Sequence, residues 1–136
     1  MKRFVVFLFC LLLIVPFSGA AEKDISVMQQ MVERLLPQYK TAFVFSHIVS
    51  DKDVFGLENR GHQICISGNN ANSMAVGLNY YLKNYCYTTV SWFASDPVQL
   101  PQKLPMVKNP VKICAKVPTR FFLNYCTFGY TMPWWT

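Results

Sequence analysis

The chain has little of what most catalytic and metal sites are built from. Its 136 residues include only 7 acidic residues and 2 histidines, and no two acids stand at a spacing that suggests a catalytic pair. His47 and His62 fall in strand-like patterns with no serine, cysteine or acid at motif spacing. A Cys-x-x-Cys pair or a cysteine-histidine cluster, the usual sign of zinc, is absent. We therefore predict no catalytic residue, metal site or cofactor within this chain.

Glycine is also scarce, and the glycine-rich phosphate-binding motifs are missing. Neither GxGxxG nor GxxxxGK[ST] occurs among the 6 glycines, so nothing supports nucleotide binding. Gly68, Asn69 and Asn70 precede a helix pattern and could present backbone N–H groups to an anion. A turn followed by a helix cap explains the same three residues fully. Internal repeats and low-complexity segments are absent as well.

The positive charge is too thinly spread to predict a nucleic-acid partner. Without Lys2 and Arg3, 11 basic residues remain against 7 acidic ones, a net charge of +4. The closest approach to a basic patch consists of scattered lysines, Lys103, Lys108, Lys112 and Lys116. Aromatic residues are not interleaved with them as they are in nucleic-acid grooves. These lysines are best interpreted as ordinary solvated side chains.

The amino terminus is typical of a secretory signal peptide. Met1, Lys2 and Arg3 are followed by an apolar run over residues 4–15, then by Pro16 and small residues. The run is shorter than the roughly 20 residues that a membrane span needs. We expect residues 1–21 to be removed by cleavage after Ala20 or Ala21, giving a secreted or periplasmic product without a membrane anchor.

Four cysteines remain after that cleavage: Cys65, Cys86, Cys114 and Cys126. Export permits disulfides, but four cysteines allow three pairings, and the sequence does not choose among them. Free, buried thiols acting as small apolar side chains are the alternative. Both readings stay open at this stage.

The hydrophobic patterns predict one α+β domain over residues 22–117. Apolar residues at three- and four-residue steps indicate helices, and period-two alternation indicates strands. Helices are predicted at residues 25–36, begun by Asp24 and ended by Pro37, and at residues 71–85, capped by Asn69 or Asn70. Strands are predicted at residues 41–49, 54–58, 62–67, 88–93 and 111–117. Four prolines mark residues 96–110 as an extended loop.

Two features of the sheet follow from this order. Residues 62–93 read as a strand-helix-strand unit, which predicts parallel strands joined by a right-handed crossover. The sheet as a whole is expected to be small and mixed, with the helix at residues 71–85 covering one face.

The last stretch, RFFLNYCTFGYTMPWWT over residues 120–136, is unusually rich in aromatic rings. Asn124, Cys126, Thr127 and Tyr130 stand among those rings. Hydrogen-bonding groups beside aromatic faces suit a pocket for a sugar. A core strand with a hydrophobic interface would have the same composition.

The runs GNNANSMAVGLNYYLKNYC, TTVSWF, LPQKLP and NYCTFGYTMPWW together resemble the amino-terminal part of glycoside hydrolase family 89, the α-N-acetylglucosaminidases. The resemblance implies a small α/β accessory domain followed by a (β/α)₈ catalytic barrel and a helical domain. It implies removal of terminal α-linked N-acetylglucosamine with retention, by two glutamates in the barrel. Residues 118–136 would begin that barrel with its first strand, and Asn124, Cys126 and Tyr130 would contact the sugar.

Both glutamates lie downstream of the point that matches Thr136, so we expect this chain to be a fragment that is inactive alone. Its partners would be the missing catalytic barrel and, through the complete enzyme, a glycan ending in N-acetylglucosamine. A secreted glycan-binding or interaction module without enzymatic activity is the alternative. A purely structural domain whose aromatic tail docks a partner chain is a third.

Overall fold

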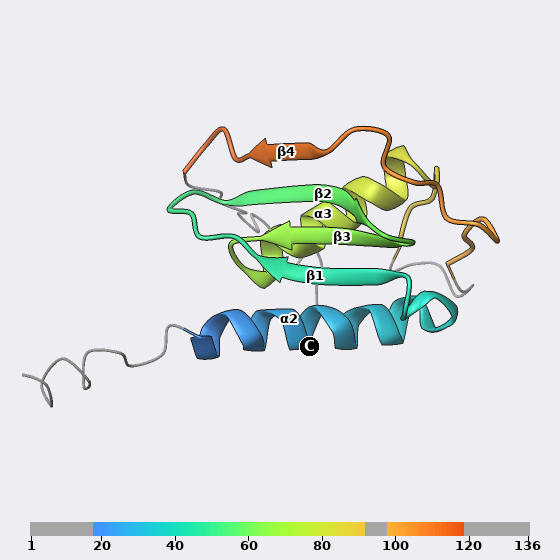
Figure 1. Ribbon diagram of the computed structural model, residues 1–136, viewed down its shortest axis with the longest axis horizontal. Helices are drawn as coiled ribbons and strands as arrows, with labels where there is room; N and C mark the ends of the chain where they lie inside the picture. Colours follow the sequence, from blue (N-terminus) through green and yellow to red (C-terminus); the bar gives the residue numbers. More distant parts are fainter. Residues whose placement is uncertain (1–17, 92–97, 119–136) are drawn as a thin grey trace, which may run out of the picture.

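A computed structural model of the chain describes residues 18–91 and 98–118. The elements, in chain order, are α2 (Ser18–Leu35), the 3-10 helix η1 (Pro37–Tyr39), β1 (Phe43–His47), β2 (Val54–Arg60), β3 (Gln63–Gly68), α3 (Ala71–Asn84) and β4 (Val111–Cys114) (Figure 1). This mixture of two α-helices and a four-stranded sheet confirms the predicted α+β class. None of the described helices is long and apolar enough to cross a membrane.

The four strands form one mixed sheet in the order β1-β3-β2-β4. β1 runs parallel to β3, whereas β2 is antiparallel to both β3 and β4. In register, Phe45 lies beside Ile66, Ile66 beside Leu57, and Leu57 beside Val111. This row of apolar residues crosses the whole sheet on one face, because neighbours in register point to the same side.

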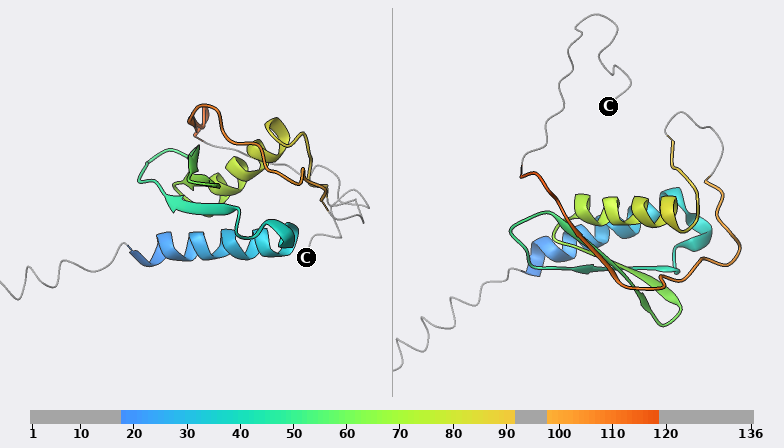
Figure 2. Two further views of the ribbon diagram at one scale, coloured as in Figure 1. Left: turned by 45° about the vertical axis from the view of Figure 1, so that its right-hand side comes forward. Right: turned by 90° about the horizontal axis from the view of Figure 1, so that it is seen from above.

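Both long helices lie on that apolar face (Figure 2). α3 packs on β2 and β3, and α2 packs on β1 and against α3. The core between helices and sheet is a single cluster, to which every layer contributes. Its largest fully buried members are Tyr81, Met28, Leu36, Leu57, Ile64, Ile66 and Met74.

α2 confirms the predicted helix but begins earlier. The helix starts at Ser18, so Asp24 lies inside it and is not its cap. Met28, Val32 and Leu36 are buried at four-residue steps, and Pro37 opens η1 directly after the helix. Leu35, an apolar residue of the predicted helix at residues 25–36 whose spacing placed it on the buried side, is exposed. The four-residue spacing fixes a narrow buried stripe, and the position next to Leu36 falls outside it.

α3 begins as the sequence predicts. The side-chain Oδ1 of Asn70 accepts a hydrogen bond from the backbone N–H of Ser73 at 2.8 Å, which makes Asn70 the N-cap. Gly77 faces the sheet, and a Cβ at that position would lie 2.9 Å from Cγ2 of Ile66. The absence of a side chain there lets the helix approach the sheet closely.

The predicted strand-helix-strand unit is wrong as far as the structure describes it. Residues 88–91 are not in a strand, and residues 92–93 lie outside the described part. The parallel partner of β3 is β1, and the connection between them contains β2 rather than a helix. Thr88 instead completes the end of α3, since its N–H donates to the carbonyl of Leu82 at 3.0 Å. Thr88, the first residue of the predicted strand, therefore helps to end the helix.

The remaining strands follow the predictions with altered ends. β1 is shorter than residues 41–49, β2 is longer than residues 54–58, and β4 is shorter than residues 111–117. The proline-rich stretch forms no helix or strand between residues 98 and 110. It is fastened to the sheet because Asn59 exchanges two hydrogen bonds with the backbone of Val107, at 2.7 and 2.9 Å.

Candidate functional site

The sugar-contacting residues predicted from the sequence, Asn124, Cys126 and Tyr130, lie outside the described residues, as does the whole predicted barrel strand after residue 118. Their role stays a prediction. Polar or exposed groups gather at several places in the described part, among them the junction between β3 and α3, the sheet face away from the helices, and a cleft between α3 and β4.

The two glutamates of α2 lie far apart, and of the two histidines one links neighbouring strands and the other is exposed. Glu22 and Glu33 are both exposed on α2, eleven residues and therefore about 16 Å apart along the helix. His47 places Nε2 3.0 Å from the backbone carbonyl oxygen of Asn69, which ties β1 to the end of β3. His62 is exposed in the turn after β2. No group of three or more metal-binding side chains occurs among residues 18–91 and 98–118.

The β3–α3 junction is a closed polar network. Oδ1 of Asp53 accepts hydrogen bonds from the side-chain amides of Asn70, at 2.9 Å, and Asn69, at 3.4 Å. Oδ1 of Asn69 accepts in turn from the Ser73 hydroxyl, at 2.8 Å, and from the N–H of Val54, at 3.1 Å. Both asparagines are thus engaged with the protein itself. The network supports the turn-and-cap interpretation of these residues over an anion site.

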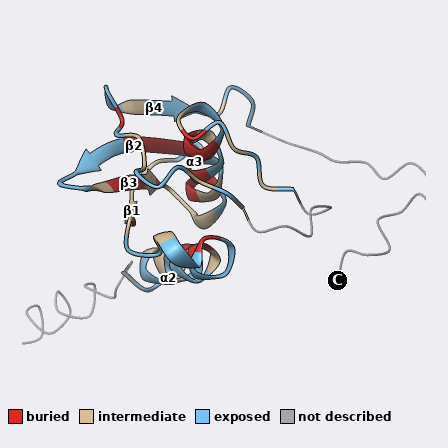
Figure 3. Ribbon diagram, turned by 90° about the vertical axis from the view of Figure 1, so that its right-hand side faces the viewer, coloured by how far each residue is buried: buried red, intermediate tan, exposed pale blue. Residues whose placement is uncertain are grey.

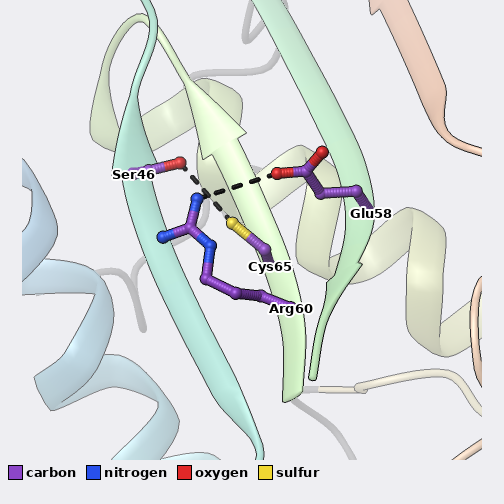
Figure 4. Close-up of polar contacts among 4 residues, drawn as sticks. All are labelled: Ser46, Glu58, Arg60 and Cys65. Atoms are coloured by element: carbon purple, nitrogen blue, oxygen red, sulfur yellow. Dashed lines mark hydrogen bonds and ion pairs between the residues drawn. The ribbon is translucent and has the colours of Figure 1, made fainter. Parts of the chain in front are cut away.

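The sheet face away from the helices carries short polar side chains (Figure 4). Oγ of Ser46 and Sγ of Cys65 lie 3.6 Å apart on neighbouring strands. Glu58 is paired with Cys65 in register and forms an ion pair with Arg60 at 3.7 Å, both side chains being more than half exposed. An exposed ion pair of this kind contributes at most about 1 kcal/mol. The face offers no pair of close carboxylates, because Glu58 is its only described acid.

The three described cysteines are free thiols: Cys65 and Cys86 are buried, and Cys114 is exposed. Burial raises the pKa of Cys86 above its ordinary value. Burial, followed by the nearby Cys86, also raises the pKa of Tyr81, whose hydroxyl donates to the carbonyl of Pro105 at 2.6 Å. A thiol held neutral is a poor nucleophile. Cys65 and Cys86 match the reading of free, buried thiols, whereas Cys114 is free but exposed; Cys126 lies outside the described residues.

The third place is a cleft of about 340 Å³ between α3 and the edge strand β4, lined by apolar residues and also by Asp53, Asn72 and Ser73. Phe55 forms part of its floor, and Val76 and Ile113 form its sides with 54% and 39% of their surfaces exposed. β4 is exposed or half-buried along its length, whereas the buried parts of β2, β3 and α3 face one another (Figure 3). The sequence did not indicate this cleft, because alternation marks a strand without revealing its place at the sheet edge.

Comparison with known proteins assigns the domain. The model of the α-N-acetylglucosaminidase N-terminal domain matches residues 26–106. Human α-N-acetylglucosaminidase is 27% identical over 125 residues, covering 87% of this chain and 17% of its own length. These matches confirm the resemblance found in the sequence.

Solved structures agree with this assignment. A family 89 glycoside hydrolase from Clostridium perfringens, in complex with 2-acetamido-1,2-dideoxynojirmycin, superposes with a TM-score of 0.76 at 34% identity, over 86% of this chain and 14% of that one. A form of the Clostridium enzyme with two glutamate-to-glutamine substitutions, bound to its substrate GlcNAc-α-1,4-galactose, gives a TM-score of 0.73 at 34% identity. This match covers 85% of this chain and 13% of that one. The chain spans less than a fifth of the length of these relatives.

Proposed function

The chain belongs to the family of α-N-acetylglucosaminidase N-terminal domains, and from this premise we propose that it serves as that domain in a secreted retaining α-N-acetylglucosaminidase. The enzyme would remove terminal α-linked N-acetylglucosamine from glycans. The observation that carries the proposal is the family match over residues 26–106, supported by the fold shared with the Clostridium perfringens enzyme at 34% identity.

In this proposal the two catalytic glutamates belong to the barrel and not to these 136 residues. A retaining glycosidase needs its two carboxyl groups about 5–5.5 Å apart. Glu22 and Glu33 are about 16 Å apart along one helix. Glu58 lies on the sheet face turned away from that helix, with the core between them. The three glutamates of the chain therefore cannot supply a retaining pair.

The domain boundaries and the sugar contacts belong to the same proposal. Residues 22–117 would form the accessory domain, and residues 118–136 would start the catalytic barrel. Active sites of such barrels gather at the carboxyl ends of the strands. Asn124, Cys126 and Tyr130 would accordingly reach the sugar from the end of the first strand, with the rings of the same stretch lining the wall.

Secretion is supported by the signal-like amino terminus and is compatible with the position of α2. Cleavage after Ala20 or Ala21 would shorten the first turn of α2, whose first buried residue is Met28. The cleavage would remove no buried residue of the core. Expression of the full chain in a secreting host, followed by amino-terminal sequencing, is expected to give a product that begins at Ala21 or Glu22. A product that retains Met1 contradicts secretion by this route.

Activity assays separate this function from its alternative. The 136-residue chain is expected not to hydrolyse an aryl α-N-acetylglucosaminide. A chimaera in which it replaces the matching segment of the Clostridium perfringens enzyme is expected to hydrolyse that substrate, and Tyr130→Ala in the chimaera should reduce kcat/KM. N-acetylglucosamine binding by the 136-residue chain alone, lost on Tyr130→Ala, would instead favour a glycan-binding module without enzymatic activity.

A further inference from the structure

We infer that the cleft between α3 and β4 is the surface on which the catalytic barrel of the same enzyme docks. This inference rests on the proposed function, because it takes the barrel as its occupant. It adds the place of contact and the side chains that make it: Val76 of α3, Ile113 of β4 and Phe55 of β2.

The composition of the cleft favours a protein partner. Val76 and Ile113 are large apolar residues that stay 54% and 39% exposed at its two sides. Ile113 pairs with Phe55 in register and so lies on the helix side of the sheet, but α3 packs on β2 and β3 and leaves β4 uncovered. Exposed apolar groups around a concave surface mark an interaction site. Burying them against another domain would remove that surface from water.

The length of the connection to the predicted barrel selects the occupant. β4 ends at Cys114, and the N–H of Ala115 still donates to the carbonyl of Asp53 at 2.8 Å, so Ala115 is fixed to the domain. Only residues 116–117 then separate it from the stretch that would begin the barrel. Two residues span at most roughly 7 Å. Cys114 and Ala115 themselves line the cleft, so the barrel would start beside it.

The opposite end of the domain provides an internal comparison. α3 starts beside the end of β4, since the parallel strands β1 and β3 and the edge strand β4 all end on that side. Its last residue, Asn84, and the loop at Met106 lie at the other end, and Asn84 is eight residues, or about 12 Å, from Val76 along the helix. Met106 is 39% exposed, the same fraction as Ile113. A tether of two residues favours contact near the cleft, not at this end.

Thiol footprinting tests the docking surface directly. Val76→Cys and, as a matched control at the far end, Met106→Cys are made both in the 136-residue chain and in the chimaera with the Clostridium perfringens enzyme. The rate of alkylation by a maleimide is followed at each position by mass spectrometry of the peptide. We expect alkylation at position 76 to be at least tenfold slower in the chimaera than in the chain alone, and the rate at position 106 to change less than twofold.

The outcomes separate the inference from the function on which it rests. Equal rates at position 76 in a chimaera that hydrolyses substrate would overturn the docking surface and leave the proposed function intact. Protection at position 106 without protection at position 76 would place the barrel at the other end of the domain. That result would also overturn the docking surface. A chimaera without Cys substitutions that folds but does not hydrolyse substrate would overturn the proposed function itself.

Discussion

The two faces of the sheet differ in chemistry although the same strands form both. The helix-covered face is made of large apolar side chains, among them Phe45, Leu57 and Ile66, which are packed under α2 and α3. The other face presents Ser46, Ser67 and an exposed ion pair. Alternation along each strand assigns successive residues to opposite faces. The comparison teaches that most of the buried core lies on one side, whereas on the other side the exposed positions can change with little consequence and the buried Cys65 cannot.

The largest expected difference between the faces comes from neighbouring residues on β3. Ile66→Ala removes a fully buried side chain below α3 and should lower the free energy of unfolding by about 2–5 kcal/mol. Ser67→Ala, one residue on and on the other face, should change it by less than about 0.5 kcal/mol. Urea unfolding of both variants measures the contrast. Equal losses would mean that the two faces do not differ as described.

Two glycines sharpen the contrast: Gly77 of α3, which packs on the apolar face of the sheet, and Gly56 of β2, on the other face. Gly77→Ala would place a Cβ 2.9 Å from the Ile66 methyl and 3.2 Å from the Phe55 ring, and neither can swing away in a packed core. Overpacking of this kind costs about 1–3 kcal/mol, more than the roughly 1 kcal/mol that alanine gains over glycine in a helix.

The matched variant is Gly56→Ala on the other face. Its Cβ would lie 2.5 Å from the Ser67 hydroxyl, which can turn to another rotamer. Thermal unfolding should therefore show a lower Tm for Gly77→Ala than for Gly56→Ala. The reverse order would contradict the close approach of α3 to the sheet.

A third effect is a loss of thermal stability in alkaline solution. It arises because the helix-covered core keeps the thiol of Cys86 and the hydroxyl of Tyr81 neutral. Burial raises the pKa of Cys86 and of Tyr81 in the folded chain. A raised pKa means that the contribution to stability is complete below the unfolded pKa, about 8.5 for a thiol, and is lost as the pH rises above it. Tm should fall between pH 8 and pH 10.5, and less steeply in Cys86→Ala. An equal slope in that variant would exclude the thiol as a cause.

The smallest effect is expected from the ion pair on the polar face. Glu58→Gln removes an interaction at 3.7 Å between side chains that are 53% and 56% exposed. Solvent screening limits the loss to less than about 0.5 kcal/mol. Urea unfolding in low and high salt should give nearly the same result for this variant. A loss comparable to that of Ile66→Ala would require the polar face to be covered.

The sequence predicted the elements that depend on local signals. The four-residue spacing of Met28 and Val32, Pro37 after the helix, and the cap at Asn70 are local, and each leads to the correct element. The order of the strands depends on contacts between distant residues. The local pattern therefore could not reveal that β3 pairs in parallel with β1. It also could not reveal that residues 88–91 form no strand and that Thr88 bonds to the end of α3.

The sugar contacts of Asn124, Cys126 and Tyr130 stay a prediction. The mixture of hydrogen-bonding groups and aromatic rings suggested a sugar pocket, and the resemblance to the family motif selected these three residues. The cleft at Val76 and Ile113 was missed because exposure at a sheet edge is decided by topology. The geometry of the described domain adds a negative result that sequence alone could not give: its three glutamates are too far apart for a retaining pair.

Hydrolysis of an aryl α-N-acetylglucosaminide by the chimaera tests the central claim most directly. If the chain serves as the N-terminal domain of an α-N-acetylglucosaminidase, the chimaera should reach a kcat/KM within about tenfold of the Clostridium perfringens enzyme, while the 136-residue chain alone gives no turnover above a blank. A chimaera that folds with the parental circular dichroism spectrum but shows no hydrolysis would contradict the claim.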